Sequence, residues 1–223
     1  MQVQFNREQV EKIVGYRFSN KLLLETAFVH SSYANEKSLE SNERLEYLGD
    51  AVLELIVTDK LYGLFNLSEG QLTKYRASLV SEQTLAFVVE NLGLDKFLLR
   101  GKGEQKSPVT SAEKCDLFEA IVGALYLDGS IDASKNFIDM ALGEAIEKLK
   151  TDGLVDNAKS RLQEMLKNQK IIYSTTKHGE SHNPIYKCTV IINGECCGYG
   201  EGKNKKSAEQ LAAKNTISMI KKA

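Results

Sequence analysis

Apolar residues recur at three- and four-residue intervals through about the first 150 residues. The clearest runs cover residues 43–65, 81–92, 111–127 and 133–149. This interval is the period of one face of an α-helix. In the run 43–65 the apolar residues continue almost all round the helix, which is typical of a central, buried helix. We see no strand-like stretch of any length here, so residues 1–150 are predicted to form an all-α domain.

The pattern changes after a short polar segment at residues 151–156. Residues 157–168 have the spacing of an amphipathic helix, whereas residues 171–177 and 185–192 are rich in the β-branched and aromatic residues of strands. Asn193 and Gly194 form a typical tight hairpin turn, with a third strand at 195–200 and a last helix at 205–222. We therefore predict a linker at 151–156 and a small α+β domain at 157–223 with the order α-β-β-β-α.

Charge is divided unequally between these two predicted domains. Residues 1–153 hold 17 Lys and Arg against 24 Asp and Glu, a net charge of −7, whereas residues 154–223 hold 12 against 6, a net charge of +6. The whole chain, with 42% hydrophobic and 26% charged residues, has the composition of an ordinary globular protein. The acidic part is suited to gathering cations and the basic part to gathering phosphates.

The sequence lacks the features of an exported or membrane-bound protein. It has no run of about 18 uncharged apolar residues, which a membrane-spanning helix needs, and its first residues are charged where a signal peptide is apolar. The four cysteines show no CxxC spacing, so we interpret them as reduced thiols rather than zinc ligands or disulfides. We expect a cytoplasmic protein with no membrane partner.

Two pairs of carboxylates lie within apolar helical runs. Glu46 and Asp50 differ by about 40° around the helix and share one face, with Glu43 on the same side. Asp116 and Glu119 form a second pair on another run. Like charges at such spacing are destabilising, and burying them costs more. Two such helices packed together would present four oxygen donors to a divalent cation.

Carboxylates with no His or Cys nearby suit Mg²⁺ or Mn²⁺ better than zinc. For each pair taken alone, a solvated acidic helix face is the alternative.

His30 has no Ser or Asp partner pattern typical of nucleophilic catalysis, and we interpret it as structural.

Two lysines occupy the predicted first turn of the last helix. Lys205 and Lys206 follow Asn204, a residue type that often caps a helix. The positive end of the helix dipole disfavours cations there, but a bound phosphate would be held by the dipole and both lysines together. An exposed lysine pair tolerated by solvent is the alternative, and the order of elements around it favours phosphate binding.

With these motifs in view, the chain resembles bacterial-type ribonuclease III over essentially its full length. Residues 42–50, with the sequence NERLEYLGD, resemble the signature of that family, and residues 116–120 resemble its second acidic motif. Residues 205–213 resemble the last helix of its double-stranded-RNA-binding domain. Residues 112–115 depart from the more apolar run expected before Asp116. The resemblance implies a helical nuclease domain followed by a double-stranded-RNA-binding domain.

The resemblance also implies roles for individual residues. The four carboxylates that match metal ligands are Glu46, Asp50, Asp116 and Glu119. Glu43 and Glu69 match acidic positions beside the cleavage site. Tyr47 matches an aromatic position that inserts into a partner subunit, whose socket must here accept a hydroxyl. The positions that match RNA contacts are Gln163, Glu164, His182, Lys205 and Lys206.

The implied activity is endonucleolytic hydrolysis of double-stranded RNA by a metal-activated water. Mg²⁺ is the implied cofactor, Mn²⁺ a substitute, and no organic cofactor is expected. The products would carry 5′-phosphate and 3′-hydroxyl ends, and a symmetric homodimer would leave a short 3′ overhang. Structured precursors of ribosomal and messenger RNA are the expected substrates.

Two other functions are open at this point. A double-stranded-RNA-binding protein whose helical part only dimerises would have no need of the four carboxylates. A helical metal phosphohydrolase acting on small nucleotides would keep its activity without residues 154–223, whereas a nuclease for long RNA would lose most of it.

Overall fold

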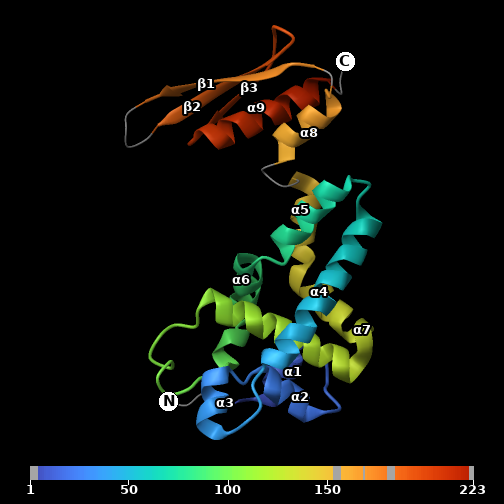
Figure 1. Ribbon diagram of the computed structural model, residues 1–223, viewed down its shortest axis with the longest axis vertical. Coiled ribbons are helices and arrows are strands. Elements are labelled where there is room, and N and C mark those ends of the chain that lie inside the picture. The colour runs from blue at the N-terminus through green and yellow to red at the C-terminus, as the bar shows by residue number, and fades with distance from the viewer. Residues whose placement is uncertain (1–4, 153–156, 168, 180–183, 221–223) are drawn as a thin grey trace. The chain divides into compact units, whose positions relative to one another are not determined.

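The computed structural model describes residues 5–152, 157–167, 169–179 and 184–220. The chain divides into two compact units, residues 1–147 and residues 148–223 (Figure 1). No helix in the described ranges is both long and apolar enough to cross a membrane. Residues 153–156 of the predicted linker lie outside the described residues, and residues 151 and 152 belong to a helix.

The first unit is helical, as predicted. The elements of its described part are α1 (Arg7–Val14), α2 (Lys21–Ala27), α3 (Ser31–Lys37), α4 (Glu43–Leu64), α5 (Glu69–Leu79), α6 (Glu82–Leu92), the 3-10 helix η1 (Leu94–Phe97) and most of α7 (Ser111–Asp152), whose residues from 148 onward are assigned to the second unit. Helix α7 is kinked at Gly129 and Ser130, whose backbone angles are not helical. This kink separates the two helical runs predicted at 111–127 and 133–149.

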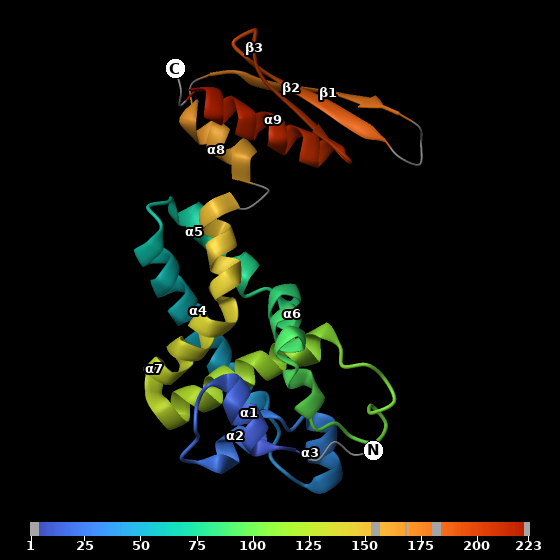
Figure 2. The same ribbon diagram turned by 180° about the vertical axis from the view of Figure 1, so that it is seen from behind.

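Helices α4 and α7 lie side by side (Figures 1 and 2) and touch backbone to backbone at two glycines. A methyl group at Gly49 would lie 1.8 Å from the carbonyl oxygen of Glu119, and one at Gly123 would lie 2.2 Å from the carbonyl oxygen of Leu45. Both distances are far inside van der Waals contact. Only a residue without a side chain fits at either position, so the two glycines fix how the helices cross.

The expectation that α4 is buried all round is wrong for one stripe of the helix. Leu53 and Val57 are fully buried, but Tyr47, Leu55 and Tyr62 are 85%, 58% and 78% exposed. These three residues lie within about 80° of one another around the helix axis. The pattern of the sequence does not distinguish an apolar stripe packed inside the chain from one left on its surface.

The second unit has the predicted α-β-β-β-α order. Its elements are α8 (Asn157–Met165), β1 (Ile171–His178), β2 (Ile185–Ile192), β3 (Glu195–Gly202) and α9 (Lys205–Ile220). The strands form an antiparallel sheet in the order β1-β2-β3, and α8 and α9 cover one face of it (Figure 2). Asn193 and Gly194 both have positive φ angles, which the predicted tight turn requires. The structure makes α8 shorter than the predicted 157–168 and extends β3 beyond residue 200.

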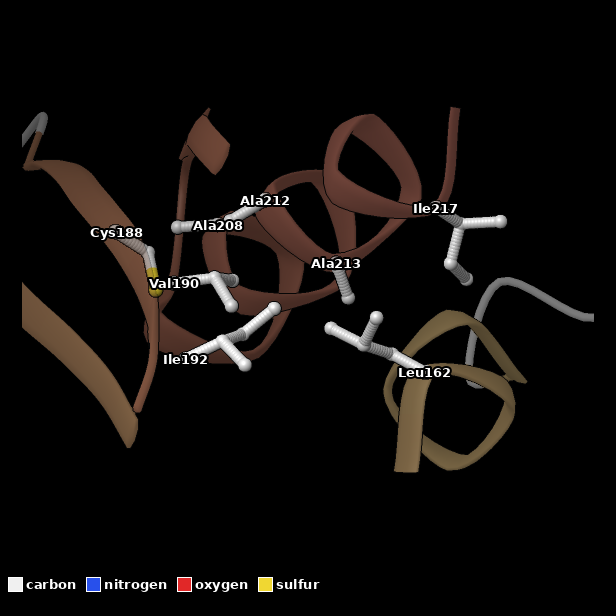
Figure 3. Close-up of a cluster of buried hydrophobic side chains, with 8 residues drawn as sticks. All are labelled: Leu162, Cys188, Val190, Ile192, Ala208, Ala212, Ala213 and Ile217. Carbon is white, nitrogen blue, oxygen red and sulfur yellow. The ribbon is translucent and has the colours of Figure 1, made fainter. Parts of the chain in front are cut away.

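The core of the second unit lies between the sheet and α9. Val190 and Ile192 point from β2 toward α9, and Leu162 approaches from α8 (Figure 3). The facing residues of α9 include Ala212, whose small side chain leaves room for a close approach. A methyl group at Gly200 on β3 would lie 2.3 Å from the backbone nitrogen of Ala212. Small residues on both sides therefore hold α9 tightly against the sheet.

Candidate active site

Helices α4 and α7 bring three of the predicted acids together. Glu46, Asp116 and Glu119 each have a carboxylate oxygen within 4.8 Å of those of the other two, and all three side chains are partly buried. Glu46 comes from the first turn of α4, and the other two lie one turn apart on α7. The contact at Gly49 and Gly123 brings these turns together, because it joins the same stretches of the two helices.

Burial and mutual repulsion make these carboxylates harder to ionise. Burial, followed by the charges of Asp50, Glu46 and Asp116, raises the pKa of Glu119 to about 7. Burial also raises the pKa of Glu46, with further increases from neighbouring acids. The pKa of Asp116 is raised by burial, and the nearby His30 opposes this rise. A cation among the three would relieve the repulsion, and carboxylate oxygens are the ligands that Mg²⁺ and Mn²⁺ prefer.

The expectation that no Cys lies near the carboxylates is wrong, because a thiol lies beside the cluster, but this thiol does not alter the preference. The sulfur of Cys115 lies 3.6 Å from a carboxylate oxygen of Glu119. Burial, and then the charges of Glu119 and Asp116, raises the pKa of the Cys115 thiol to about 12. The atoms close enough together to share an ion are the carboxylate oxygens of Glu46, Asp116 and Glu119, and the sulfur is not among them. The side chains present therefore fit a hard divalent cation.

The fourth predicted ligand, Asp50, lies outside the group of three. It is exposed on α4, one turn after Glu46, although its charge contributes to the raised pKa values of Glu46 and Glu119. The next acid along this row, Glu54, instead pairs with Arg76 of α5 at 2.7 Å. Along this row of α4, Glu46 thus belongs to the group of three, Asp50 lies outside it, and Glu54 forms an ordinary ion pair.

The two auxiliary acids differ in their relation to the cluster. Glu43 is exposed, accepts a hydrogen bond from Ser41 at 2.7 Å, and adds to the raised pKa of Glu46, so it lies beside the three acids. Glu69 is the exposed first residue of α5, and its carboxylate accepts a hydrogen bond from Thr73 at 3.1 Å. It is not among the three clustered acids.

The exposed Tyr47 borders a pocket of about 660 Å³ on the helical unit. Side chains of α2, of the beginning of α4, and of α7 just before its kink form its walls. Its apolar lining is Leu22, Leu23, Leu45, Leu48 and Leu127. A large exposed aromatic ring therefore lies next to a pocket of the same unit that combines these leucines with the charged residues Glu40, Glu43 and Arg44.

The second unit presents basic side chains at the start of α9. Asn204 caps this helix, as predicted, because its side-chain oxygen accepts a hydrogen bond from the backbone nitrogen of Ser207 at 2.8 Å. Lys205 and Lys206 are exposed in the first turn, and Gln163 is exposed on α8. The side chain of Glu164 and the whole of His182 lie outside the described residues.

Three polar residues near the acid cluster are missing from the site predicted by sequence. Arg100 and Glu113 form a buried ion pair of 2.7 Å. His30 lies 4.0 Å from the same oxygen of Glu113 and opposes the rise in the pKa of Asp116. The sequence does contain a signal for Glu113, since Thr110 three residues earlier completes the spacing of a capping box.

Comparison with known proteins finds similarity in both units. A family model described as "Ribonuclease-III-like" matches residues 20–146, and one described as "Double-stranded RNA binding motif" matches residues 158–220. The chain is 40% identical over 226 residues to a protein named Ribonuclease 3 from Carboxydothermus hydrogenoformans, covering 97% of this chain and 96% of that one. It is 43% identical to Ribonuclease 3 from Enterococcus faecalis, covering 95% and 96%.

A solved structure resembles the helical unit. It is the nuclease domain of ribonuclease III from Campylobacter jejuni, which is 34% identical, with a TM-score of 0.59. The match covers 62% of this chain and 97% of that one. That Campylobacter jejuni domain is described as having structural flexibility in a region involved in dimer formation.

Proposed function

The chain belongs to the ribonuclease III family, and from this premise we propose that it cleaves double-stranded RNA as a homodimeric, divalent-metal-dependent endonuclease. Residues 1–150 would be the nuclease and dimerisation domain, residues 151–156 the linker, and residues 157–223 the RNA-binding domain. The observation that carries the proposal is the meeting of Glu46, Asp116 and Glu119 on two helices in backbone contact. Folding gains nothing from gathering three repelling carboxylates in a partly buried place.

The acids would hold Mg²⁺, or Mn²⁺ in its place, with Asp50 as a fourth ligand from the next turn of α4. Bound there, the ion would supply an activated water and neutralise the charge that develops on the phosphodiester. The chain's own contribution is to fix the carboxylates before substrate arrives. Glu43 beside the cluster, and Glu69, would assist in placing substrate or ion. The expected products carry a 5′-phosphate and a 3′-hydroxyl.

The proposed homodimer is supported by apolar surface at the start of α4, the helix that carries the signature residues 42–50. Tyr47 is 85% exposed, and a pocket with leucine walls lies beside it. In a twofold dimer the same patch meets itself, so Tyr47 of each subunit would enter the pocket of the other. Two acid clusters in one dimer would cut both strands and leave a short 3′ overhang.

RNA binding is supported by the matched RNA-binding motif and by the basic start of α9. Lys205 and Lys206 would contact phosphates, together with Gln163, Glu164 and His182. Such domains recognise A-form geometry with little dependence on sequence. We propose that structured precursors of ribosomal and messenger RNA are cut in the cytoplasm, where the four free cysteines would stay reduced.

A cleavage assay on a long RNA duplex tests the proposal. Wild-type protein should cut the duplex with Mg²⁺ and not with excess chelator, and a sequencing gel should show 5′-phosphate ends. Glu119→Gln should reduce cleavage at least about 100-fold, since one ligand oxygen loses its charge, while binding of the duplex survives. Glu54→Gln is the matched control, because Glu54 continues the row on α4 but pairs with Arg76.

The two rival functions give different results in this assay. A protein that only binds RNA would show no Mg²⁺-dependent cutting. A phosphohydrolase for small nucleotides would leave the duplex intact and hydrolyse mononucleotides instead. Undiminished cleavage by Glu119→Gln would refute the assignment of this residue as a ligand.

The dimer is tested by Tyr47→Ala. We expect the dimer to dissociate about 30-fold more readily, the equivalent of about 2 kcal/mol for a buried aromatic anchor. Sedimentation equilibrium at several protein concentrations measures this change. Tyr199→Ala, which removes an exposed tyrosine from the second unit, should leave dissociation unchanged. Equal dissociation of Tyr47→Ala and wild type would remove Tyr47 from the interface.

A further inference from the structure

A buried ion pair lies one helical turn before Asp116. Arg100 and Glu113 are only 7% and 9% exposed, and the Nε atom of Arg100 lies 2.7 Å from Oε1 of Glu113. Glu113 belongs to the segment 112–115, which is less apolar than the family pattern. The structure explains this departure, because Arg100 supplies the partner that a buried carboxylate needs.

The same pair holds the segment that leads into α7. The second carboxylate oxygen of Glu113 accepts hydrogen bonds from the backbone nitrogen of Thr110 at 2.7 Å and from its hydroxyl at 2.8 Å. The backbone nitrogen of Glu113 donates to the Thr110 hydroxyl in return, at 3.2 Å. Arg100 also donates to the carbonyl oxygen of Ser107 at 2.8 Å. Both ends of the segment 100–113 are thus tied to one ion pair.

The geometry of this ion pair indicates that it orients the surrounding groups rather than adding net stability. A buried ion pair seldom adds net stability, because desolvation offsets the attraction, yet it fixes groups in one arrangement. His30, Glu104 and Glu113 are also close enough together to suggest a second metal site. Both oxygens of Glu113 already accept hydrogen bonds from Arg100 and Thr110, so the contacts of this acid are explained without an ion.

We propose that Arg100 and Glu113 are positioning residues for Asp116. They fix where α7 begins and how its first turn is rotated. This in turn sets the direction in which the Asp116 side chain points from the helix, one turn later. Glu46 lies on another helix, α4, so a small rotation of the first turn of α7 would separate Asp116 from it. This inference rests on the proposed metal centre, and it assigns a role to two residues outside the ligand set.

The test compares Mn²⁺ affinity in Glu113→Gln and Arg100→Gln, measured by electron paramagnetic resonance of free Mn²⁺ with the full chain and no RNA. If the pair positions Asp116, both variants should bind Mn²⁺ about tenfold more weakly, as is usual when support for a ligand is lost. If the pair acts only through its charges, the change in Mn²⁺ affinity should have opposite signs in the two variants. Loss of Glu113 would leave a repelling cation, whereas loss of Arg100 would leave an additional anion that attracts Mn²⁺.

Lys60→Gln is the matched control, because it likewise removes an ion pair made with α7: Lys60 of α4 pairs with Asp139, farther along α7. It should lower the melting temperature without changing Mn²⁺ affinity. Unchanged affinity in both test variants, or changes of opposite sign, would overturn the proposal. If Arg100→Gln does not fold, Arg100→Lys replaces it, and unchanged affinity there has the same consequence. Failure of the wild type to bind Mn²⁺ would instead refute the proposed metal centre itself.

Discussion

The acid cluster and the start of α9 hold their charges in opposite ways. Glu46 and Glu119 are partly buried and come from helices far apart in the sequence, which meet only in the folded unit. Lys205 and Lys206 are adjacent residues, exposed to solvent on a single turn. The first arrangement depends on how two helices pack, and the second depends only on where one helix begins. The two sites should therefore respond to different perturbations.

The energetic consequences differ in the same way. The clustered carboxylates repel one another in a place where solvent screens them poorly, and a bound cation would relieve this repulsion. The exposed lysines are screened by water and salt and disturb the fold little. Interaction of the lysines with phosphates would instead depend strongly on ionic strength.

The largest effect should follow from Gly123→Ala, which acts on packing alone. Its new methyl group would lie 2.2 Å from the carbonyl oxygen of Leu45, so α4 and α7 must move apart. We expect a loss of about 3 kcal/mol in the free energy of unfolding and loss of cleavage, because Glu46 is drawn away from Glu119. Urea unfolding and the duplex assay measure the two effects.

Gly143→Ala on the same helix is the control. A methyl group at Gly143 has no atom within 4 Å to contact, so alanine should stabilise α7 by up to about 1 kcal/mol through its helix propensity. Cleavage should be unaffected. Full cleavage by Gly123→Ala would mean that the acid cluster does not depend on the backbone contact.

The same contrast explains what the sequence could predict. The order of elements follows from apolar period, the turn at Asn193 and Gly194 from its residue types, and the cap at Asn204 from its position before a helix. All of these are local signals. The unusual chemistry of Glu46 and Asp116 is also visible, because charges in apolar helical runs need a reason.

Features that depend on distant partners could not be predicted in this way. Nothing near Arg100 in the sequence indicates that its partner is Glu113, and the exposure of Tyr62 depends on what packs against α4. Gly49 lies within the signature, but its role is apparent only from its distance to Glu119 on another helix. The separation of Asp50 from the other acids likewise depends on side-chain placement.

A smaller effect should follow from replacing both lysines at the start of α9. Lys205→Gln together with Lys206→Gln should weaken duplex binding about tenfold at moderate salt and reduce the slope of log affinity against log salt by about 2. Folding should be unharmed or slightly improved, because the change removes cations from the positive end of a helix. A filter-binding salt series measures the slope.

Lys214→Gln, an exposed position farther along α9, should leave the salt slope unchanged. An unchanged slope in the double variant would mean that these lysines do not contact phosphates. Weakened binding with an unchanged slope would indicate that they act through the shape of the unit rather than through their charge.

The smallest effect should appear in the pH dependence of stability, and it separates the two regions most directly. Glu119 has a folded-state pKa of about 7 against an ordinary value of 4.5, so the folded protein holds this proton more tightly than the unfolded chain does. The contribution to stability is therefore complete below about pH 4.5 and is lost as the pH rises through 7. Since Glu119 is partly exposed, solvent reduces the effect to about 1 kcal/mol.

Urea unfolding without metal should show this decline in stability between about pH 5 and pH 8, and Mg²⁺ should oppose it. Glu119→Gln should make the decline shallower, because the variant lacks the acid with the pKa of about 7, while Glu46 and Asp116, whose pKa values are also raised, remain. The double lysine variant should retain the wild-type slope, because it leaves the acid cluster unchanged. If stability declines equally with pH in Glu119→Gln and in the wild type, the group that loses its proton over this range is not Glu119.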